Sequence, residues 1–327
     1  MKKNEAFKRL KIVLIGGGTG LSTIIKGLKK FNSNISAIVT VTDDGGSSGR
    51  LRKEYDIIPP GDLRNCLVAL AEEDNILSEL FSYRFGGSGE IAGHSFGNLF
   101  LMAMSDICGG FEKGITEVSK ILASKGEVIP STFSTVHLVA QDEHSNILRG
   151  ETEISSLKGS IRRLEIEPND VDSAPQALTA INNADLVILG PGSFYTSVVS
   201  NLLVPDITKV LKKSTAKKIF ICNIMSQPGE TAGYRAEEYL YILKDYIGEN
   251  IIDYIFINNG EISPDLLKKY KSQNSYPVQF NDQGGIKFLP QTKTIIADFF
   301  GQEHSQDSLF ARHDPEKLAK KIVEISI

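Results

Sequence analysis

Short apolar runs alternate along the chain with longer stretches that carry apolar residues at helical spacing. The first run, Ile12 to Ile15, is followed by four glycines within residues 16–20 and then by apolar positions at helical spacing to Leu28. This order predicts a buried strand, a tight turn and a helix. The turn and the first N–H groups of the helix form a surface that can hold a phosphate. A sharp structural bend would explain the same glycines.

The order of strand and helix returns through most of the sequence. Further strands are predicted at residues 35–41, 184–190, 218–223, 254–259 and 294–299. Residues 62–125 have helical patterns, with Asp62 as the expected N-cap, and residues 135–167 alternate as short strands. Asp314 and Pro315 predict the start of a C-terminal helix. We therefore expect a single Rossmann-like, doubly wound α/β domain over residues 1–327, with a mainly parallel sheet, a helical insertion at 62–125 and antiparallel edge strands at 135–167.

The composition is that of an ordinary globular protein and excludes several classes. The chain has 327 residues, of which 41% are hydrophobic and 23% charged, and its net charge is −4. A mildly acidic chain is a poor general binder of nucleic acid. Cys66, Cys108 and Cys222 form no metal-binding spacing, and no apolar stretch reaches the length of a signal h-region or a membrane span. We expect a cytoplasmic protein with reduced thiols and no membrane span.

Glycine-rich or amide-rich stretches follow five of the predicted parallel strands. They lie at residues 16–20, 43–50, 190–196, 223–229 and 258–260. Ligands of open parallel sheets bind beyond the carboxyl ends of the strands, where the strand order reverses. One glycine turn is weak evidence, but five polar strand ends at one edge predict a crevice for a phosphate- or nucleotide-containing ligand.

Gly190, Gly192, Ser193 and Thr196 predict a second anion site, where hydroxyls and free N–H groups act as in the first turn. Two such sites suit a diphosphate, or a phosphate and a second anion. The sequence is neither GxGxxG nor GxxxxGK[ST], which disfavours a nicotinamide oxidoreductase.

Asp43 and Asp44 are adjacent, so in an extended chain their side chains point to opposite sides. Only one is then expected to face the ligand, where it can hold a ribose hydroxyl or Mg²⁺. The other can cap the turn. The sequence does not distinguish these roles.

Arg50 and Arg64 are expected to grip phosphate, whereas Arg52 is expected to be a solvated arginine. His94 and Asn98 are four residues apart and share a face if a helix begins early. They form either a general acid with an orienting amide or a satisfied polar cap where the helix meets a glycine turn.

Seven blocks of the sequence carry a resemblance to a known family. They are GGGTGLSTIIKGLK, VTDDGGSSGRLR, PPGDLRNCL, GHSFGNLFL, ADLVILGPGSFYTSVVSNLLV, CNIMSQPGETAGY and ARHDPEKLA. In this order they closely resemble the gluconeogenesis factor family (YvcK-like), the bacterial sister of the 2-phospho-L-lactate transferases (CofD-like). The resemblance runs from about Lys11 to about Lys317.

The resemblance implies a Rossmann-like cytoplasmic protein that binds uridine-diphosphate sugars such as UDP-N-acetylglucosamine. It also implies a regulatory role in cell shape and wall synthesis during growth on gluconeogenic carbon sources. Where the transferases have a shorter NTGDD-type loop, this chain has TVTDDGGSSGRL, which puts the transferase reaction in doubt. A Mg²⁺-dependent transferase of phosphorus-containing groups remains the alternative.

Combining the motifs with the resemblance gives one set of expected ligand contacts and leaves several questions open. The expected contacts are Gly16, Gly17, Gly18, Thr19, Gly20, Asp43, Asp44, Gly46, Ser47, Arg50, Asp62, Arg64, Asn65, His94, Asn98, Gly190, Gly192, Ser193, Tyr195, Thr196, Asn223, Gln227, Tyr276 and Arg312. No catalytic residue is assigned, and Asp43, Asp44 and His94 are the candidates. The expected partners are a nucleotide sugar or another nucleotide diphosphate and proteins of cell-wall regulation. A homodimer and a Mg²⁺ ion at Asp43 or Asp44 are left open.

Overall fold

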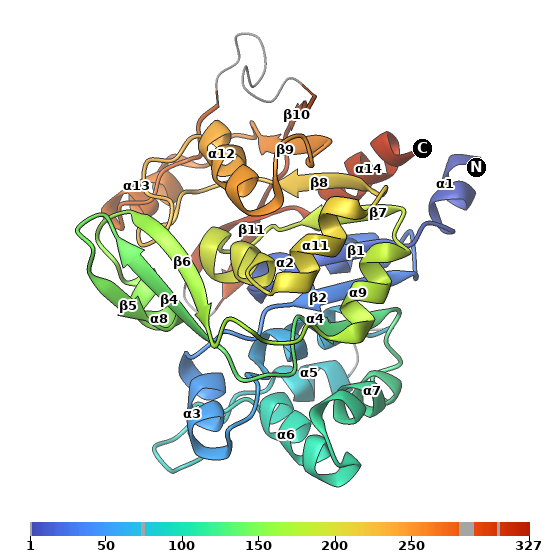
Figure 1. The fold of residues 1–327 in the computed structure, drawn as a ribbon, viewed down its shortest axis with the longest axis vertical. Helices are drawn as coiled ribbons and strands as arrows, with labels where there is room; N and C mark the ends of the chain where they lie inside the picture. The colour runs from blue at the N-terminus through green and yellow to red at the C-terminus, as the bar shows by residue number, and fades with distance from the viewer. Residues whose placement is uncertain (1, 73–75, 281–290, 306–307) are drawn as a thin grey trace.

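A parallel sheet forms the centre of the molecule (Figure 1). The computed structural model describes residues 2–72, 76–280, 291–305 and 308–327. The sheet has seven strands in the order β10-β9-β8-β7-β1-β2-β3, and every neighbouring pair is parallel. The strands are β1 Ile12–Gly16, β2 Ile35–Val39, β3 Glu127–Pro130, β7 Leu186–Leu189, β8 Lys217–Ile221, β9 Tyr254–Asn258 and β10 Lys293–Ala297. This confirms the expected α/β fold with a mainly parallel sheet.

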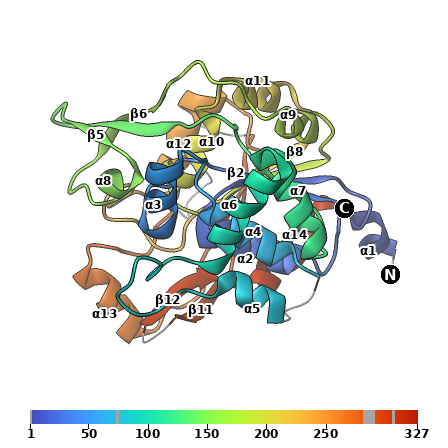
Figure 2. The ribbon, with the colours of Figure 1, turned by 90° about the horizontal axis from the view of Figure 1, so that it is seen from below.

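Helices cover both faces of the sheet because its central strands are apolar on both sides. The helices are α1 Lys2–Phe7, α2 Gly18–Leu28, α3 Gly46–Tyr55, α4 Gly61–Leu70, α5 Ile76–Ser82, α6 Phe96–Cys108, α7 Phe111–Ile121, α8 Glu151–Ser155, α9 Pro175–Asn182, the π-helix η1 Phe194–Val199, α10 Ser200–Leu202, α11 Pro205–Lys213, α12 Ala236–Ile247, α13 Pro264–Ser272 and α14 Pro315–Ser326. Figure 2 shows α9 and α11 on one side of the sheet and α2, α4 and α14 on the other. In the described part of the chain, no helix combines the length and the apolarity needed to cross a membrane.

The strand order reverses between β1 and β7. From β1 the chain continues to β2 and β3 on one side, and it later returns to place β7 against the other side of β1. The helices that follow the two strands, α2 after β1 and α11 after β7, therefore lie on opposite faces of the sheet, and a crevice is left at the carboxyl ends of these strands.

The antiparallel strands form two small sheets of their own. β4 (His137–Asp142), β5 (Ile147–Arg149) and β6 (Ile161–Glu167) form a sheet in the order β5-β4-β6, and β11 (Phe300–Ser305) pairs with β12 (Ser308–His313). The expectation of antiparallel strands is confirmed. Their expected place at an edge of the main sheet is wrong, because alternation identifies a strand but not its hydrogen-bonding partner.

The two predicted helix caps differ in outcome. Asp314 caps α14 and accepts hydrogen bonds from the N–H groups of Glu316 and Lys317, as expected. Asp62 is not the cap of α4, since the helix begins at Gly61 with Pro60 as its N-cap residue. The Asp62 carboxyl instead accepts a hydrogen bond from the N–H of Gly18, which joins the start of α4 to the first glycine bend.

Candidate functional site

A cavity of about 440 Å³ opens at the carboxyl ends of the central strands. It lies where the strand order reverses, between the bend after β1 and the bend after β7. Its wall includes the backbone of Gly17 to Gly20 and of Pro191 to Ser193. The rest of the wall consists of Asp43, Asp62, Glu151, Ser197, Asn223, Ile224, Met225, Ser226, Gln227, Pro228, Tyr270, Gln273, Ser275, Ala311, Arg312 and His313.

The two glycine bends lie in direct contact. A Cβ on Gly20 would lie 2.4 Å from the carbonyl oxygen of Pro191, and one on Gly192 would lie 3.3 Å from that of Gly17. Gly18 has φ of +61°, and no atom lies within 4 Å of the place a Cβ would occupy. Gly20 is thus set by packing between the bends, while Gly18 provides a left-handed turn beside open space.

The first bend retains the features of an anion site. The N–H groups of Thr19 and Gly20 belong to the first turn of α2 and have no intrahelical acceptor. Both residues line the cavity, so these donors and the positive end of the helix dipole lie at its wall.

The second bend does not have the free N–H groups that the sequence predicted. Oε2 of Glu230 accepts hydrogen bonds from the N–H groups of Tyr195 (2.7 Å) and Thr196 (3.2 Å), and Oε1 accepts one from the Thr196 hydroxyl (2.9 Å). Glu230 is 1% exposed. The chain therefore supplies its own carboxylate to the start of η1, and what remains of this bend for a ligand is Gly192 and Ser193.

A chain of amide hydrogen bonds joins the segments that follow β7 and β8. Gln227 Nε2 donates to Ser193 Oγ at 2.8 Å, and Gln227 Oε1 accepts from Asn223 Nδ2 at 3.0 Å and from the Phe194 N–H at 3.3 Å. These bonds hold three cavity residues, Ser193, Asn223 and Gln227, in fixed relative positions.

Three carboxyl groups, those of Asp43, Asp62 and Glu151, line the cavity. Burial raises the pKa of Asp62 to about 7, and the Asp43 carboxylate adds to this effect. Burial raises the pKa of Glu151 to about 9, with further contributions from Asp43, Asp62, Glu230 and Asp44. Near neutral pH the wall therefore keeps protons that isolated carboxyls would have lost.

Of the adjacent acids, Asp43 lines the cavity and Asp44 does not. The Asp44 carboxylate accepts hydrogen bonds from the N–H (2.9 Å) and the hydroxyl (2.7 Å) of Thr152. Among the described residues, no group of three or more His, Cys, Asp or Glu side chains is placed to hold a metal ion. Mg²⁺ prefers one or two carboxylates together with ligand phosphates and water. The carboxyl groups of Asp43, Asp62 and Glu151 would supply one or two of these ligands. The residues present therefore fit Mg²⁺ only when a bound phosphate supplies further ligands.

Ser47, His94 and Asn98 meet in a buried cluster outside the cavity lining. Ser47 Oγ lies 3.0 Å from His94 Nδ1 and accepts hydrogen bonds from Asn98 Nδ2 (3.1 Å) and the Ser95 N–H (3.4 Å). Because the hydroxyl accepts twice, its single proton is directed to His94 Nδ1. Burial lowers the pKa of His94, which agrees with a neutral ring. The cluster ties α3 to the start of α6.

The predicted arginines have different surroundings. Arg50 donates to the backbone oxygens of Ala92 (2.7 Å) and Glu90 (3.4 Å) and does not line the cavity. Arg64 is buried within α4, and burial lowers its pKa to about 10. Arg52, expected in solvent, is 6% exposed, so that expectation is wrong. Arg312 does line the cavity and pairs with Glu303 at 3.1 Å.

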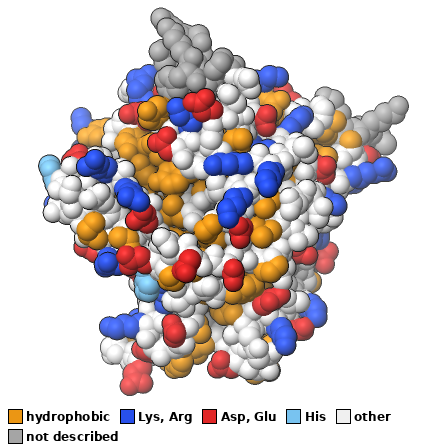
Figure 3. All heavy atoms as spheres, in the orientation of Figure 1, with side chains coloured by type: hydrophobic (Ala, Val, Ile, Leu, Met, Phe, Trp, Pro, Cys, Tyr) orange, Lys and Arg blue, Asp and Glu red, His pale blue; other side chains and the backbone are white. Residues whose placement is uncertain are grey.

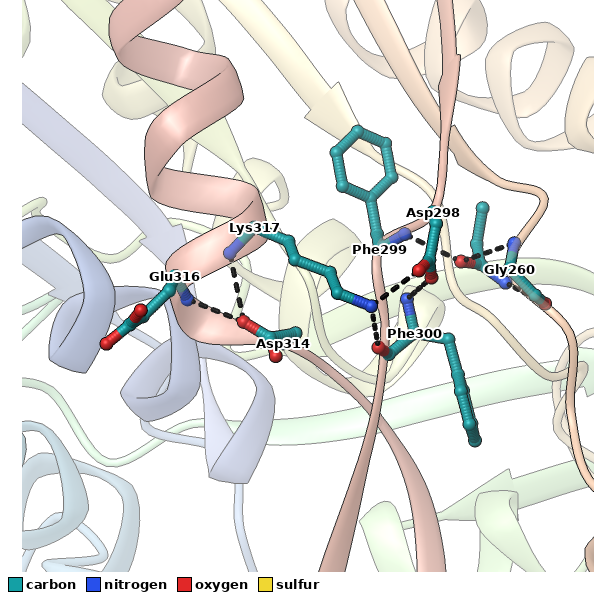
Figure 4. Close-up of polar contacts among 8 residues, drawn as sticks. Gly260, Asp298, Phe299, Phe300, Asp314, Glu316 and Lys317 are labelled. Atoms are coloured by element: carbon teal, nitrogen blue, oxygen red, sulfur yellow. Dashed lines mark hydrogen bonds and ion pairs between the residues drawn. The ribbon is translucent and has the colours of Figure 1, made fainter.

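The other predicted contacts are not part of the cavity lining. They are Gly16, Gly46, Asn65, Gly190, Tyr195, Thr196 and Tyr276. The fifth polar strand end does not reach the cavity either. The amide oxygen of Asn258 accepts hydrogen bonds from the N–H groups of Gly260 and Phe299. Nζ of Lys317, in α14, donates to the carboxylate of Asp298, which follows β10 (Figure 4). These residues connect β9 and β10 to α14.

Several cavity residues were absent from the sequence prediction. They are Glu151, Pro191, Ser197, Ile224, Met225, Ser226, Pro228, Tyr270, Gln273, Ser275, Ala311 and His313. Pro191, Met225, Ser226 and Pro228 lie inside motifs that were recognised, and His313 follows Arg312 directly. Burial lowers the pKa of His313 to about 4, and its Nε2 lies 3.2 Å from the oxygen of Cys222. Glu151 and Tyr270 have no local signal, since only the tertiary structure brings them to the cavity.

Comparison with known proteins gives matches over nearly the whole chain. The profile of the 2-phospho-L-lactate transferase CofD family matches residues 12–298. A gluconeogenesis factor from Halalkalibacterium halodurans is 44% identical over 317 residues, covering 97% of each chain. One from Bacillus subtilis is 41% identical over 315 residues, covering 96% of this chain and 98% of its own. A crystal structure of a Bacillus halodurans protein, 43% identical, has a TM-score of 0.89 and covers 97% of this chain and 100% of its own.

Proposed function

Since the chain belongs to the CofD family and to the gluconeogenesis factors within it, we propose that it is a regulatory protein whose cavity binds a nucleotide diphosphate sugar of the UDP-N-acetylglucosamine type. In this proposal the ligand reports the supply of wall precursors. The protein then adjusts wall synthesis and cell shape in the cytoplasm during growth on gluconeogenic carbon.

The observation that carries the proposal is the contact between the two glycine bends at one cavity. The N–H groups of Thr19 and Gly20 and the surface of Gly192 and Ser193 lie at the same wall. The cavity of about 440 Å³ falls within the roughly 300–1,000 Å³ common for small-molecule sites. A diphosphate fits the first bend, and the amides of Asn223 and Gln227 offer polar contacts to a sugar or a base.

The carboxyl groups in the wall set a condition on this binding. Asp43, Asp62 and Glu151 would repel a diphosphate if all were ionised. Three features reduce that repulsion. Glu151 keeps its proton at neutral pH, and Asp62, with a pKa of about 7, keeps part of its own. A Mg²⁺ ion between Asp43 and the phosphates would reduce the repulsion further. We therefore expect binding to be strengthened by Mg²⁺ and to weaken as the pH rises through about 7, where Asp62 loses its proton.

A Mg²⁺-dependent transferase of phosphorus-containing groups is the second candidate. It is favoured by Asp43 and Asp62 beside the first anion bend and by the match to the transferase family. In that case Asp43 would hold the metal and a carboxyl with a pKa near 7 would exchange a proton with the substrate.

Titration calorimetry with UDP-N-acetylglucosamine, with and without Mg²⁺, tests the proposal. We expect saturable binding to the unaltered protein and its loss in Ser193→Leu, which places a large side chain in the cavity. Ser33→Leu is the matched control, because Ser33 is exposed and lies before β2 at the other end of the sheet. No heat at millimolar ligand, together with tight binding of a guanine nucleotide, would refute the UDP-sugar assignment.

The same samples separate the regulator from the transferase. Release of phosphate or nucleotide from a bound donor, abolished in Asp43→Asn, would establish a transferase. Binding without turnover, weakened but not abolished in that variant, supports the regulator.

A further inference from the structure

His313 is the last residue of β12, and its side chain lies in the wall of the cavity of about 440 Å³ between the glycine bends. Nε2 of its ring lies 3.2 Å from the backbone oxygen of Cys222, the residue that follows β8. This contact joins the end of β12 to the carboxyl end of β8. The ring is therefore held in one orientation within the cavity wall.

The contact with Cys222 fixes which nitrogen of the His313 ring carries the proton. A carbonyl oxygen can only accept a hydrogen bond, so Nε2 must be protonated and must donate. Burial lowers the pKa of His313 to about 4, so the ring is neutral near pH 7. In a neutral imidazole only one nitrogen carries a proton, and Nδ1 therefore keeps a lone pair that can accept a hydrogen bond.

Nδ1 of His313 is open to the cavity. In the part of the chain that the structure describes, no residue donates a hydrogen bond to it, and Nε2 makes the one bond of the ring. Nδ1 is also not one of the buried polar atoms left without a partner. Since His313 is 8% exposed and lines the cavity, the open side of Nδ1 is the cavity.

Other polar groups of the wall have accepted hydrogen bonds from the chain itself. The hydroxyl oxygen of Tyr270 accepts from the N–H of Ala311 at 3.0 Å, and Ser226 Oγ accepts from the N–H of Tyr276 at 3.0 Å. These hydroxyls can still donate a proton to a ligand. Nδ1 of the neutral His313 ring can only accept, so it requires a ligand group that donates.

The overall charge of the protein does not select an anionic ligand. The net charge is −4, and on the face shown in Figure 3 acidic and basic side chains are interspersed with apolar ones. Neither feature provides a positive field that would attract phosphates, so selection depends on contacts inside the cavity. A ligand that covers Nδ1 without donating to it removes water from a buried acceptor and leaves that acceptor unpaired, which costs binding free energy.

We propose that His313 determines which part of the ligand occupies its end of the cavity, because Nδ1 accepts a hydrogen bond from a hydroxyl or N–H group of the nucleotide sugar. An ionised phosphate oxygen has no proton to donate, so the diphosphate stays at the first glycine bend. The inference rests on the proposed function, since it assigns a contact to that ligand. His313 is then a specificity-determining residue.

Two substitutions separate the two ring nitrogens in titration calorimetry with UDP-N-acetylglucosamine. His313→Gln places an amide nitrogen near the position of Nε2, where it can donate to Cys222, but has no acceptor at the position of Nδ1. His313→Asn does the reverse, because its amide oxygen replaces Nδ1 and its side chain is too short to reach Cys222. We expect the dissociation constant to rise roughly tenfold in His313→Gln and to stay within about twofold in His313→Asn.

His144→Gln is the matched control, since the His144 side chain is 77% exposed on the turn after β4, and it should bind as the unaltered protein does. Circular dichroism checks that each variant is folded. Equal weakening in His313→Gln and His313→Asn would mean that the ring only anchors β12, which overturns the proposal.

Ligand analogues that each lack one donor, in the sugar, the ribose or the uracil, identify the group that meets Nδ1. One analogue should bind roughly tenfold more weakly than the parent to the unaltered protein and about as well as the parent to His313→Gln. If every analogue loses the same affinity in both proteins, no donor meets His313 and the proposal is wrong.

The same titrations distinguish this contact from the function on which it rests. No binding of UDP-N-acetylglucosamine to the unaltered protein would remove the proposed function and the contact together. Binding of equal strength to the unaltered protein and to His313→Gln would remove the contact alone.

Discussion

Gly20 holds a position at which one hydrogen atom decides whether the two glycine bends can meet. Any other residue would place its Cβ 2.4 Å from the oxygen and 2.7 Å from the carbonyl carbon of Pro191. Both of these are backbone atoms, so they cannot move aside as a flexible side chain would. The backbone of Gly20 is helical, and the requirement for glycine is therefore steric rather than conformational.

Gly20→Ala should push the bends apart and lower the free energy of unfolding by roughly 1–3 kcal/mol, as overpacking does in other cores. It should also weaken binding of UDP-N-acetylglucosamine, because the two walls of the cavity lose their relative position. Urea denaturation and calorimetry measure the two effects. Gly86→Ala is the control, since no atom lies within 4 Å of its Cβ position. Equal stability of both variants would contradict this account of Gly20.

At the scale of elements, η1 and the segment after β8 behave as one unit. Glu230 holds the start of η1, and Gln227 from the same segment holds Ser193. The hydroxyl of Tyr239 from α12 donates to Thr231 Oγ1, which in turn accepts from the Gln227 N–H. A ligand that displaces Gln227 from Ser193 would therefore act on η1, and η1 also carries Tyr195 to a separate cavity lined by residues of β6 and α12.

Glu230→Ala removes the acceptor of two buried N–H groups and one hydroxyl. We expect the free energy of unfolding to fall by about 3 kcal/mol, the order of magnitude for leaving buried donors without partners. Glu230→Gln keeps an oxygen for the N–H groups and should cost much less. Chemical denaturation compares the two, and a loss of similar size in both would indicate that the charge of Glu230, rather than its hydrogen bonds, matters.

At the scale of the whole molecule, buried acids make the stability depend on pH. Folding raises the pKa of Asp62 to about 7 and that of Glu151 to about 9, from ordinary carboxyl values near 4. Between these limits the folded state binds more protons than the unfolded state. The free energy of unfolding must then fall as the pH rises.

Denaturation at a series of pH values should show a decline in the free energy of unfolding from about pH 5 to about pH 9. Glu151→Gln should flatten the upper part of this decline, because the group that titrates near pH 9 is removed. Glu90→Gln, at an exposed position, should leave the profile unchanged. A flat profile for the unaltered protein would show that neither carboxyl is held protonated by the fold.

The sequence was a good guide to the fold and to part of the cavity. Apolar runs that end in glycine identified the strands and the bends at Gly17 and Ser193, because local backbone requirements are visible in local sequence. It failed at Glu230, which fills the second bend from a distant segment, and at Arg52, whose burial depends on the packing of α3. Neither burial nor a distant partner can be read from a residue's neighbours.

By itself, then, the sequence determined six of the seven strands of the central sheet, the parallel α/β class and the glycines that close approach of two backbones requires. The tertiary structure alone decided which bend keeps free donors, which of Asp43 and Asp44 faces the cavity, and that Glu151 joins them there. The physical reason is that strand pairing and the desolvation of charges depend on groups far apart along the chain, and these groups become neighbours only after folding.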